Sequence, residues 1–343
     1  MFRMSLRDVI VIGAGPSGLS AAFAAKRRGL DYQVLEQGVL VNSIYRFPPH
    51  MVFFTTPELL EIGGLPFVSP YEKPTRLEAL RYYRKVVDTF DLQIAYDETV
   101  TSVELEKAGR AGEAGGEDFF SIETRSSRGV RRSRDARTVI FATGYYDHPV
   151  MLNIPGEDLP HVNHFYTDPH PFYRKRVVVV GGGNSAAEAA LELYRAGASV
   201  TLVHRGPEMK STIKYWVRPD VENRFKEGSI ATRFNSLVQE IRPTSIIVQT
   251  KDGTEELSAD AVFLLVGYRA DTDLFVRAGV QLTEREGPVH DTETFETNVP
   301  GLYVAGGAIA GVDTGTIFIE NGRFHGEKII EAIARRLEQV HTI

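Results

Sequence analysis

Residues 8–18, DVIVIGAGPSG, decide the fold of the first part of the chain. Four apolar residues suited to a buried parallel strand, Val9 to Ile12, lead into a glycine turn, and an alanine-rich, helix-favouring segment follows. Gly13 permits the tight turn, Gly15 allows the backbone to approach a pyrophosphate, and Gly18 allows helix and strand to pack closely. The helix N-terminus then offers free N–H groups to phosphates. The stretch therefore predicts a dinucleotide-binding unit.

A second strand completes this unit. The run Tyr32 to Leu35 ends at Glu36, where an acidic side chain would hydrogen-bond the hydroxyl groups of a ribose. Because strand, turn, helix, strand and acid follow in the required order, a nucleotide site is favoured over a chance glycine turn.

The composition limits the possible chemistry. The chain has 343 residues, enough for two domains, and its 43% hydrophobic and 24% charged residues are typical of a soluble globular protein. A net charge of -6 gives no reason to expect nucleic acid, and no apolar run suits a membrane span or a signal peptide, so we expect a cytoplasmic protein. The sequence contains no cysteine, which excludes disulfides, metal thiolates and an enzyme thiol. Redox chemistry must therefore reside in a cofactor, and no metal site is expected.

The opening pattern returns over residues 176–203, with GGGNSA in place of the first glycine turn. The repeat predicts a second dinucleotide-binding unit. At the end of its second strand, His204 and Arg205 replace the acid, and Lys210 and Lys214 lie close enough in sequence to assist. Basic side chains there would accommodate the 2′-phosphate of NADP rather than the 2′-hydroxyl of NAD.

The segments between and after the repeats predict further elements. A long stretch, residues 37–70, is rich in aromatic residues and proline, and either lines a ligand or packs on its own side chains. The other expected elements are a helix over 75–91 capped by Thr75 and Glu78, strands over 99–106, 119–124, 129–134 and 138–143, a Gly/Ala-rich loop over 108–116, and one helix from Ile317 to the C-terminus. The arginines between 125 and 137 are expected to lie on a solvated hairpin face.

These patterns predict an α/β protein with two Rossmann-like, three-layer domains. Two apolar runs that end in glycine, at Gly144 and Gly267, mark the crossings between them. The first domain then comprises residues 1–149 and 268–343, and the second, residues 150–267, is inserted into it. Because one unit ends in an acid and the other in basic residues, we expect two different cofactors, FAD in the first domain and NADPH in the second.

The whole chain resembles the low-molecular-weight thioredoxin reductases, and within that group the bacillithiol disulfide reductases of the YpdA type. The motifs that carry the resemblance are GAGPSG at 13–18, HMVFFTTPELLEIGGLPF at 50–67, ATGYYDHP at 142–149, GGGNSAAEAALEL at 181–193, KYWVRPD at 214–220 and GLYVAGGAIAGVDTGTIFIENGRFHG at 301–326. The resemblance implies a homodimeric flavoprotein that passes a hydride from NADPH to FAD, and then electrons to a small thiol disulfide such as bacillithiol disulfide.

The resemblance also assigns residues to the two cofactors. Those expected to hold FAD are Gly13, Ala14, Gly15, Pro16, Ser17, Gly18, Glu36, Gln37, Val100, Thr143, Gly144, Gly306, Gly307, Thr316 and Ile317. Those expected to hold NADPH are Gly181, Gly183, Asn184, Ser185, His204, Arg205 and Lys210. The catalytic candidates beside the flavin are Ser17 and His50, with Tyr166 also considered.

Three departures from the family pattern bear on the electron acceptor. The Cys-x-x-Cys of thioredoxin reductases is replaced by residues 164–168, HFYTD, and Gly306-Gly307 stands where many relatives have Gly-Asp. Members of the YpdA type often carry a cysteine in the first glycine motif, where this chain has Ser17. A serine forms no mixed disulfide, so either reduced flavin acts directly on the disulfide or the acceptor differs.

Other functions remain open at the level of the sequence. A ferredoxin or flavodoxin–NADP reductase would also work without cysteine, with a small protein as its electron acceptor. A flavin monooxygenase would suit the aromatic stretch at 45–67. A redox-sensing module that binds FAD and NADP without turnover is the alternative outside the enzymes.

Overall fold

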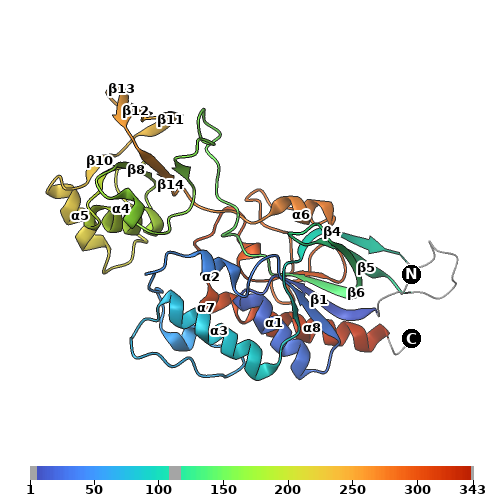
Figure 1. Cartoon of the computed structure of the whole chain (residues 1–343). Coiled ribbons are helices and arrows are strands. Elements are labelled where there is room, and N and C mark those ends of the chain that lie inside the picture. The colour runs from blue at the N-terminus through green and yellow to red at the C-terminus, as the bar shows by residue number, and fades with distance from the viewer. Residues whose placement is uncertain (1–5, 108–116, 341–343) are drawn as a thin grey trace. The chain divides into compact units, whose positions relative to one another are not determined.

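The computed structural model describes residues 6–107 and 117–340 (Figure 1). The predicted loop over 108–116 and the last three residues lie outside the described residues. The chain forms two compact units, of which unit 1 comprises Met1–Arg46, His50–His148 and Arg269–Ile343, and unit 2 comprises Phe47–Pro49 and Pro149–Tyr268. Each unit contains a parallel sheet with helices, which confirms the α/β class.

Unit 1 is organised around a sheet with a parallel part and an antiparallel part. Its strands are β1 (Arg7–Ile12), β2 (Tyr32–Leu35), β3 (Ile94–Ala95), β4 (Thr99–Glu106), β5 (Phe119–Arg125), β6 (Arg131–Phe141) and β15 (Leu302–Val304). The parallel part has the order β3-β2-β1-β6-β15, and β6, β5 and β4 form the antiparallel part. The strand, glycine turn, helix and strand predicted at the start of the chain are therefore confirmed.

Strand β6 belongs to both parts of the sheet. We expected separate strands over 129–134 and 138–143, and this was wrong, because the backbone stays extended through Ala136 and Arg137. Neither residue breaks a strand as Gly or Pro would. The first half of β6 pairs with β5, and the second half lies parallel between β1 and β15.

The helices of unit 1 are α1 (Pro16–Arg27), α2 (Asn42–Arg46), α3 (Arg76–Phe90), α6 (Thr272–Arg277), α7 (Ile319–Gly322) and α8 (His325–Val340), with short 3-10 turns η1 (Pro57–Leu60) and η3 (Gly306–Ile309). The predicted capping box of α3 is confirmed: the N–H of Glu78 donates to the Thr75 hydroxyl, and the Glu78 carboxylate accepts from the N–H of Thr75. In Figure 1, α1 and α8 lie side by side next to the sheet.

The C-terminal helix differs from the prediction, because it is broken between Gly322 and His325. At Gly322 a Cβ would lie 3.1 Å from both the Ser17 hydroxyl oxygen and the Cα of Gly306. At Gly326 a Cβ would lie 2.3 Å from the backbone nitrogen of Ala21 in α1. The break thus brings the end of α7 against Ser17 and Gly306, and the start of α8 against the backbone of α1.

Unit 2 contains a five-stranded parallel sheet with apolar cores on both faces. Its elements are β7 (Val162–Asn163), η2 (His170–Phe172), β8 (Arg176–Val180), α4 (Asn184–Arg195), β9 (Ser199–Val203), α5 (Arg218–Lys226), β10 (Ala231–Arg233), β11 (Leu237–Arg242), β12 (Ser245–Thr250), β13 (Gly253–Ser258) and β14 (Ala261–Leu264). The order is β10-β9-β8-β14-β7, and β11, β12 and β13 form a separate antiparallel sheet.

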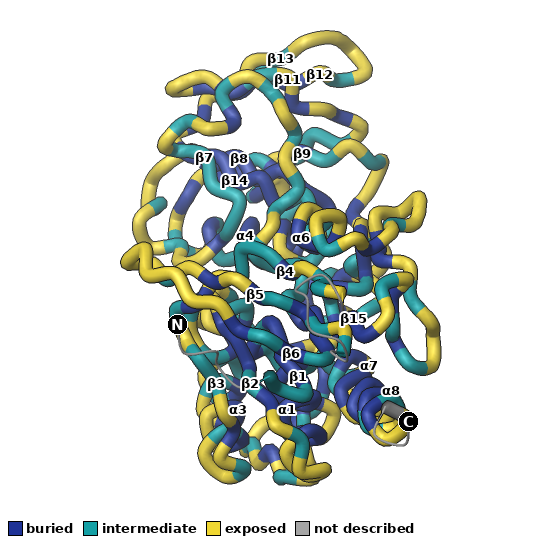
Figure 2. Tube along the Cα trace, turned by 90° about the vertical axis from the view of Figure 1, so that its right-hand side faces the viewer, coloured by how far each residue is buried: buried dark blue, intermediate teal, exposed yellow. Residues whose placement is uncertain are grey.

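The strands of unit 2 alternate their side chains between the two cores. Val177 and Val179 of β8 pack with α4, whereas Val178 and Val180 pack with side chains of the antiparallel sheet. Figure 2 shows β8 and β14 in the colour of buried residues. Within the described residues, no helix is long and apolar enough to cross a membrane.

A buried ion pair joins the start of β4 to β6. The Glu98 and Arg134 side chains are 5% and 7% exposed, and the two guanidinium nitrogens of Arg134 lie 2.6 and 2.7 Å from the two carboxylate oxygens of Glu98. Burial would raise the pKa of Glu98, but hydrogen bonds from Arg134 and Thr124 outweigh burial, and the pKa is lowered. The expectation that the arginines of this strand are solvated was therefore wrong for Arg134.

We expect Glu98→Gln to destabilise unit 1 by about 3 kcal/mol or more, because it leaves the Arg134 guanidinium buried without a carboxylate. The measurement is urea unfolding followed by circular dichroism, with Glu240→Gln as the matched control, since Glu240 pairs with Arg242 at an exposed site. The lowered pKa of Glu98 also predicts a pH dependence. The stabilisation is present above the unfolded-state value of about 4.3 and is lost as the pH falls below it. An unfolding midpoint that Glu98→Gln leaves unchanged would contradict the assignment.

Candidate functional sites in the two units

The first glycine turn brings backbone against backbone at two of its three glycines. Gly13 has φ +108°, and a Cβ there would lie 2.4 Å from the Ala142 carbonyl oxygen. At Gly18 a Cβ would lie 1.9 Å from the Gly13 carbonyl oxygen. Gly15 is different, because nothing lies within 4 Å of its Cβ position. The space beside Gly15, before the N-terminus of α1, is therefore open to a ligand, whereas the other two glycines serve packing.

Glu36 lies at the end of β2 and is only 4% exposed. Its two carboxylate oxygens each accept one backbone N–H, from Ala14 and from Gly38, both at 2.8 Å. Burial raises the pKa of Glu36, although these two hydrogen bonds oppose the shift. A carboxylate has about four acceptor positions, so lone pairs remain for the hydroxyl groups of a ribose. Glu36 thus also ties the glycine turn to β2, a role that the sequence pattern does not reveal.

Thr143 carries a buried hydroxyl group for which the described chain offers no hydrogen-bond partner. Its Cα lies 3.4 Å from the Cβ position of Gly13, so this hydroxyl belongs to the same site. Buried polar atoms rarely stay unsatisfied, and a bound polar ligand would satisfy this one. The next residue, Gly144, has φ +69° and open space at its Cβ position. The turn, Glu36 and Thr143 together fit a nucleotide cofactor.

Ser17 lies between two glycines that are distant in the sequence. Gly306 has φ +62°, and a Cβ there would lie 2.2 Å from the Ser17 hydroxyl oxygen, while the Cβ position of Gly322 is 3.1 Å from the same atom. The N-cap of α1 is Gly15, so Ser17 is not the capping residue. At Gly307 a Cβ would meet the Tyr145 ring at 2.7 Å. We call Ser17, Gly306 and Gly322 the Ser17 niche.

Four other residues of unit 1 were predicted to hold the cofactor, and of these Ile317 adjoins the niche. Gln37 is exposed and donates to Asp147, and both line a pocket of about 440 Å³ together with Arg46. Val100 packs at the edge of the apolar core on β4. Thr316 donates its hydroxyl hydrogen to the Asp313 carbonyl. The Cγ2 atom of Ile317 lies 3.7 Å from the Cβ position of Gly322. The predicted cofactor roles of these four residues stay predictions.

His50 is exposed in a turn, and no hydrogen bond of its side chain is found among the described residues. Its catalytic role stays a prediction.

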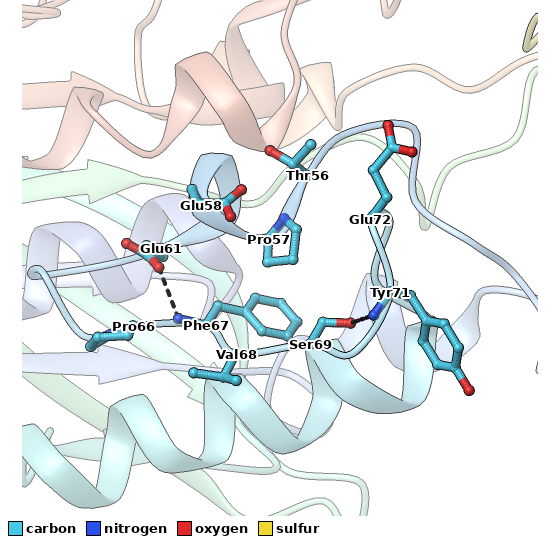
Figure 3. A pocket seen from close by; sticks show the side chains of 10 residues that line it. All are labelled: Thr56, Pro57, Glu58, Glu61, Pro66, Phe67, Val68, Ser69, Tyr71 and Glu72. Atoms are coloured by element: carbon cyan, nitrogen blue, oxygen red, sulfur yellow. Dashed lines mark hydrogen bonds between the residues drawn. The ribbon is translucent and has the colours of Figure 1, made fainter.

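For the aromatic stretch that follows His50, the predicted alternatives were the wall of a ligand site and packing on its own side chains. The structure has features of both. Phe53 and Phe67 are buried, whereas Phe54 and Tyr71 are exposed at 55% and 62%. Residues 56–72 also contribute the lining of a pocket of about 420 Å³, in which Glu61 accepts the N–H of Phe67 (Figure 3).

The second glycine turn repeats the geometry of the first. Gly181 has φ +149°, and a Cβ there would lie 2.4 Å from the Leu265 carbonyl oxygen, while nothing lies within 4 Å of the Cβ position of Gly183. Asn184 begins α4, and its side-chain amide binds the backbone of Thr212 and Lys214. Its neighbour Ser185 is exposed in the first turn of the same helix. The open space beside Gly183 therefore faces a helix N-terminus, as at the first turn.

Three cationic or titratable side chains gather beside this second turn. The His204 ring occupies the space at Gly182, whose Cβ position lies 2.2 Å from the ring, and the N–H of Lys210 donates to the Gly182 carbonyl. Arg205 is exposed. Burial and the neighbouring charges of Lys210 and Arg205 lower the pKa of His204. Within the described residues, neither of these two cations pairs with a carboxylate, so the group attracts an anion.

Lys214 does not join this group, contrary to the prediction. Its ammonium group is 7% exposed and lies 2.6 Å from a carboxylate oxygen of Glu188 in α4. Tyr166 also lies elsewhere: it is buried in the core of unit 2, where it donates to Glu192 at 2.8 Å. Burial and this carboxylate raise the pKa of Tyr166, so its hydroxyl group stays protonated. Within the described residues, no group of His, Asp and Glu could hold a metal ion.

Comparison with known proteins identifies the family. Residues 10–306 match the pyridine nucleotide-disulphide oxidoreductase family. The chain belongs to this family. Flavin and NAD(P) are the cofactors that the family and its thioredoxin reductase-like members imply, and each of the two glycine turns leaves open space at one glycine, Gly15 and Gly183. The predicted oxidoreductase class is confirmed, and the absence of a Cys-x-x-Cys motif agrees with the cysteine-free sequence.

Similar members of the family cover nearly the whole chain. Bacilliredoxin reductase Bdr of Bacillus subtilis (strain 168) is 41% identical over 340 residues, which are 97% of this chain and 99% of that protein. The structure of bacillithiol disulfide reductase Bdr (YpdA) from Bacillus cereus has a TM-score of 0.91 and 38% identity, and the match covers 97% of this chain and all (100%) of that one. A ferredoxin–NADP reductase of Ignicoccus hospitalis is 28% identical, over 88% of this chain and 90% of that protein. These similarities confirm the predicted resemblance and the predicted fold class.

Sequence patterns missed several residues of this oxidoreductase that shape its first site. His325 accepts a hydrogen bond from the backbone of Gly306, and Asp147 binds Gln37 and Arg46. Neither residue lies in a glycine motif. The available signal was the position of His325 in the motif at 301–326 and of Asp147 in the motif at 142–149, and these motifs indicate membership of the family but no role.

The two kinds of glycine predict opposite behaviour for two similar variants. Gly15 has φ -75° and ψ 176°, which alanine adopts freely, so we expect Gly15→Ala to fold normally but to lose bound flavin. Gly18→Ala forces a methyl group onto the Gly13 carbonyl, so we expect it to lose about 2 kcal/mol or more of stability. Thermal unfolding and the flavin absorbance of the purified protein measure both effects. Flavin retained by Gly15→Ala at the level of the unchanged protein would contradict the site.

Proposed function

We propose that this chain is an NADPH-dependent FAD flavoprotein that reduces a small thiol disulfide, with bacillithiol disulfide as the first candidate. The observation that carries the proposal is the full-length similarity to proteins named bacillithiol disulfide reductase and bacilliredoxin reductase. In the overall reaction NADPH, one proton and the disulfide give NADP⁺ and two thiols. We further propose a homodimer, as the resemblance to the family implies, and a cytoplasmic location, as the composition suggests.

The charges at the two strand ends support the assignment of the two cofactors. In unit 1 the buried carboxylate of Glu36 suits the ribose hydroxyl groups of FAD, and it would repel an additional phosphate. In unit 2 His204, Arg205 and Lys210 suit the dianionic 2′-phosphate of NADPH. An anion among these groups would also favour protonation of His204, whose pKa is now lowered by burial and by the neighbouring cations.

The protein supplies binding and electrostatics, because it has no thiol of its own. When bound, FAD supplies a two-electron carrier between NADPH and the disulfide. The Ser17 hydroxyl in its niche is available to donate a hydrogen bond, but it forms no bond to sulfur. His50, in the exposed turn before the aromatic stretch, is the second proposed acid–base residue.

The main alternative is an NADP reductase of a small electron-carrier protein. The absence of cysteine favours it, and a ferredoxin–NADP reductase is among the relatives. A flavin monooxygenase and a redox-sensing module differ from both by their reaction with oxygen or by the absence of turnover. Identification of the electron acceptor would therefore distinguish the four functions.

We expect Arg205→Ala to raise the KM for NADPH about tenfold to a hundredfold, because a charge-assisted contact to the 2′-phosphate is lost. The KM for NADH should not change, since NADH lacks this phosphate. Arg242→Ala is the control, because Arg242 pairs with Glu240 on the separate antiparallel sheet. Steady-state kinetics with both nucleotides test this prediction. An unchanged KM for NADPH would contradict the assignment of Arg205 to the 2′-phosphate.

The acceptor is tested by stopped-flow kinetics of the holoenzyme. We expect NADPH to reduce the flavin, and bacillithiol disulfide to reoxidise it much faster than dissolved oxygen. Ferredoxin and flavodoxin are the comparison acceptors. Fast reoxidation by either of these, with none by bacillithiol disulfide, would replace the proposal by the carrier reductase. Reduction without any rapid acceptor would favour the sensing module.

A further inference from the structure

His325 is a buried histidine for which the proposed reaction has no role. It is the first residue of α8 and is 9% exposed. The backbone N–H of Gly306 donates a hydrogen bond to its Nδ1 atom, with a distance of 3.1 Å between the two nitrogens. Because a backbone N–H can only donate, Nδ1 must be unprotonated and the ring hydrogen must lie on Nε2. The contact therefore requires one tautomer of the neutral imidazole.

The surroundings of the ring preserve this neutral form. The ring stacks on Phe295 with centroids 4.3 Å apart and an interplanar angle of 22°, and His290 stacks on Phe295 at 6.0 Å. Lys328 of α8 lies 5.9 Å from the same phenyl ring. Burial, helped by the charges of Lys328 and His290, lowers the pKa of His325 to about 4. The imidazole thus remains an acceptor at neutral pH.

The donor of this hydrogen bond is a residue whose conformation needs support. Gly306 has φ +62° and begins η3, separated from the end of β15 by Ala305 alone. The absence of a side chain lets the Ser17 hydroxyl approach, but it also leaves the backbone free to adopt other conformations. The hydrogen bond that its N–H donates to the stacked His325 ring restricts that freedom. The ring therefore acts on the Ser17 niche through the Gly306 backbone.

We propose that His325 is a positioning residue of the first nucleotide site, which holds the Gly306 backbone in place beside Ser17. Only the identity of the ligand as FAD rests on the proposed function. The residue does not touch the reacting atoms, and its contribution is the geometry of the niche.

The tautomer can be measured in the unchanged holoenzyme. Nitrogen-15 NMR of the labelled protein distinguishes a protonated from an unprotonated ring nitrogen, and the chain has nine histidines, so the His325→Asn variant identifies the signals of His325. We expect Nδ1 to be unprotonated and Nε2 to carry the hydrogen between pH 6 and pH 8, a range that lies above the lowered pKa of about 4. A hydrogen on Nδ1 would overturn the proposal, whatever the variants show.

Two variants test the function of the contact. The side-chain oxygen of asparagine reaches the position of Nδ1, whereas that of glutamine reaches one bond farther, and both variants lose the stacked ring. We expect His325→Asn to keep the dissociation constant of FAD within about threefold, and His325→Gln to raise it about tenfold, the usual size for one lost hydrogen bond. Equal FAD affinities in the two variants would overturn the proposal.

The flavin of each variant is also reduced with NADPH, because a misplaced cofactor slows this step. We expect His325→Gln to be reduced more slowly than His325→Asn at saturating FAD. If the unchanged protein binds FAD but NADPH does not reduce it, the proposed function fails while the inference about His325 stands. The two failures are thus distinguishable.

Discussion

The close approach of two backbones at the first glycine turn is the constraint on which unit 1 depends. With 1.9 Å between the Cβ position of Gly18 and the Gly13 carbonyl oxygen, only glycine allows α1 to follow β1 in this direction. The turn aims the helix N-terminus at the space beside Gly15. It also places Ser17 where the segments at Gly306 and Gly322 can close around it. One local constraint thereby determines where the phosphates and the electron-transfer end of a cofactor can lie.

The two nucleotide sites share this backbone and differ in charge. Each has one glycine without space for a side chain at the strand end and one with open space before the helix. Glu36 brings a buried carboxylate to the first site, whereas the second has His204 with two cations unpaired within the described residues. The backbones of the two turns are therefore alike, and the side chains at the two strand ends carry the difference in charge.

Because the chain has no cysteine, the site around Ser17 is described by its shape rather than by a thiol. Ser17 stands where the resemblance to the YpdA type leads us to expect a cysteine, and Gly306 and Gly322 lie against its hydroxyl group. The neutral His325 supports the same enclosure from α8. Both observations point to a site in which the chain orients a cofactor and leaves electron transfer to it.

Much of this protein could be predicted from its sequence, because the deciding signals are local. The glycine turns, the acid at Glu36, the basic pair at 204–205 and the capping box of α3 depend on residues a few positions apart. The wrong predictions concern contacts across long separations, such as Arg134 with Glu98 and Lys214 with Glu188. The charge of a side chain does not reveal whether it is exposed to solvent. Its burial depends on which distant residue lies opposite it in the folded chain.

The sequence by itself therefore determined the order of the elements, the family and the different charges of the two nucleotide sites. Only the tertiary structure decided that β6 is a single strand, that the last helix breaks after Gly322, and that His325 binds Gly306. The physical reason is that periodicity and capping act within one element. The shape of the Ser17 niche instead depends on backbones from distant parts of the chain meeting at contact distance.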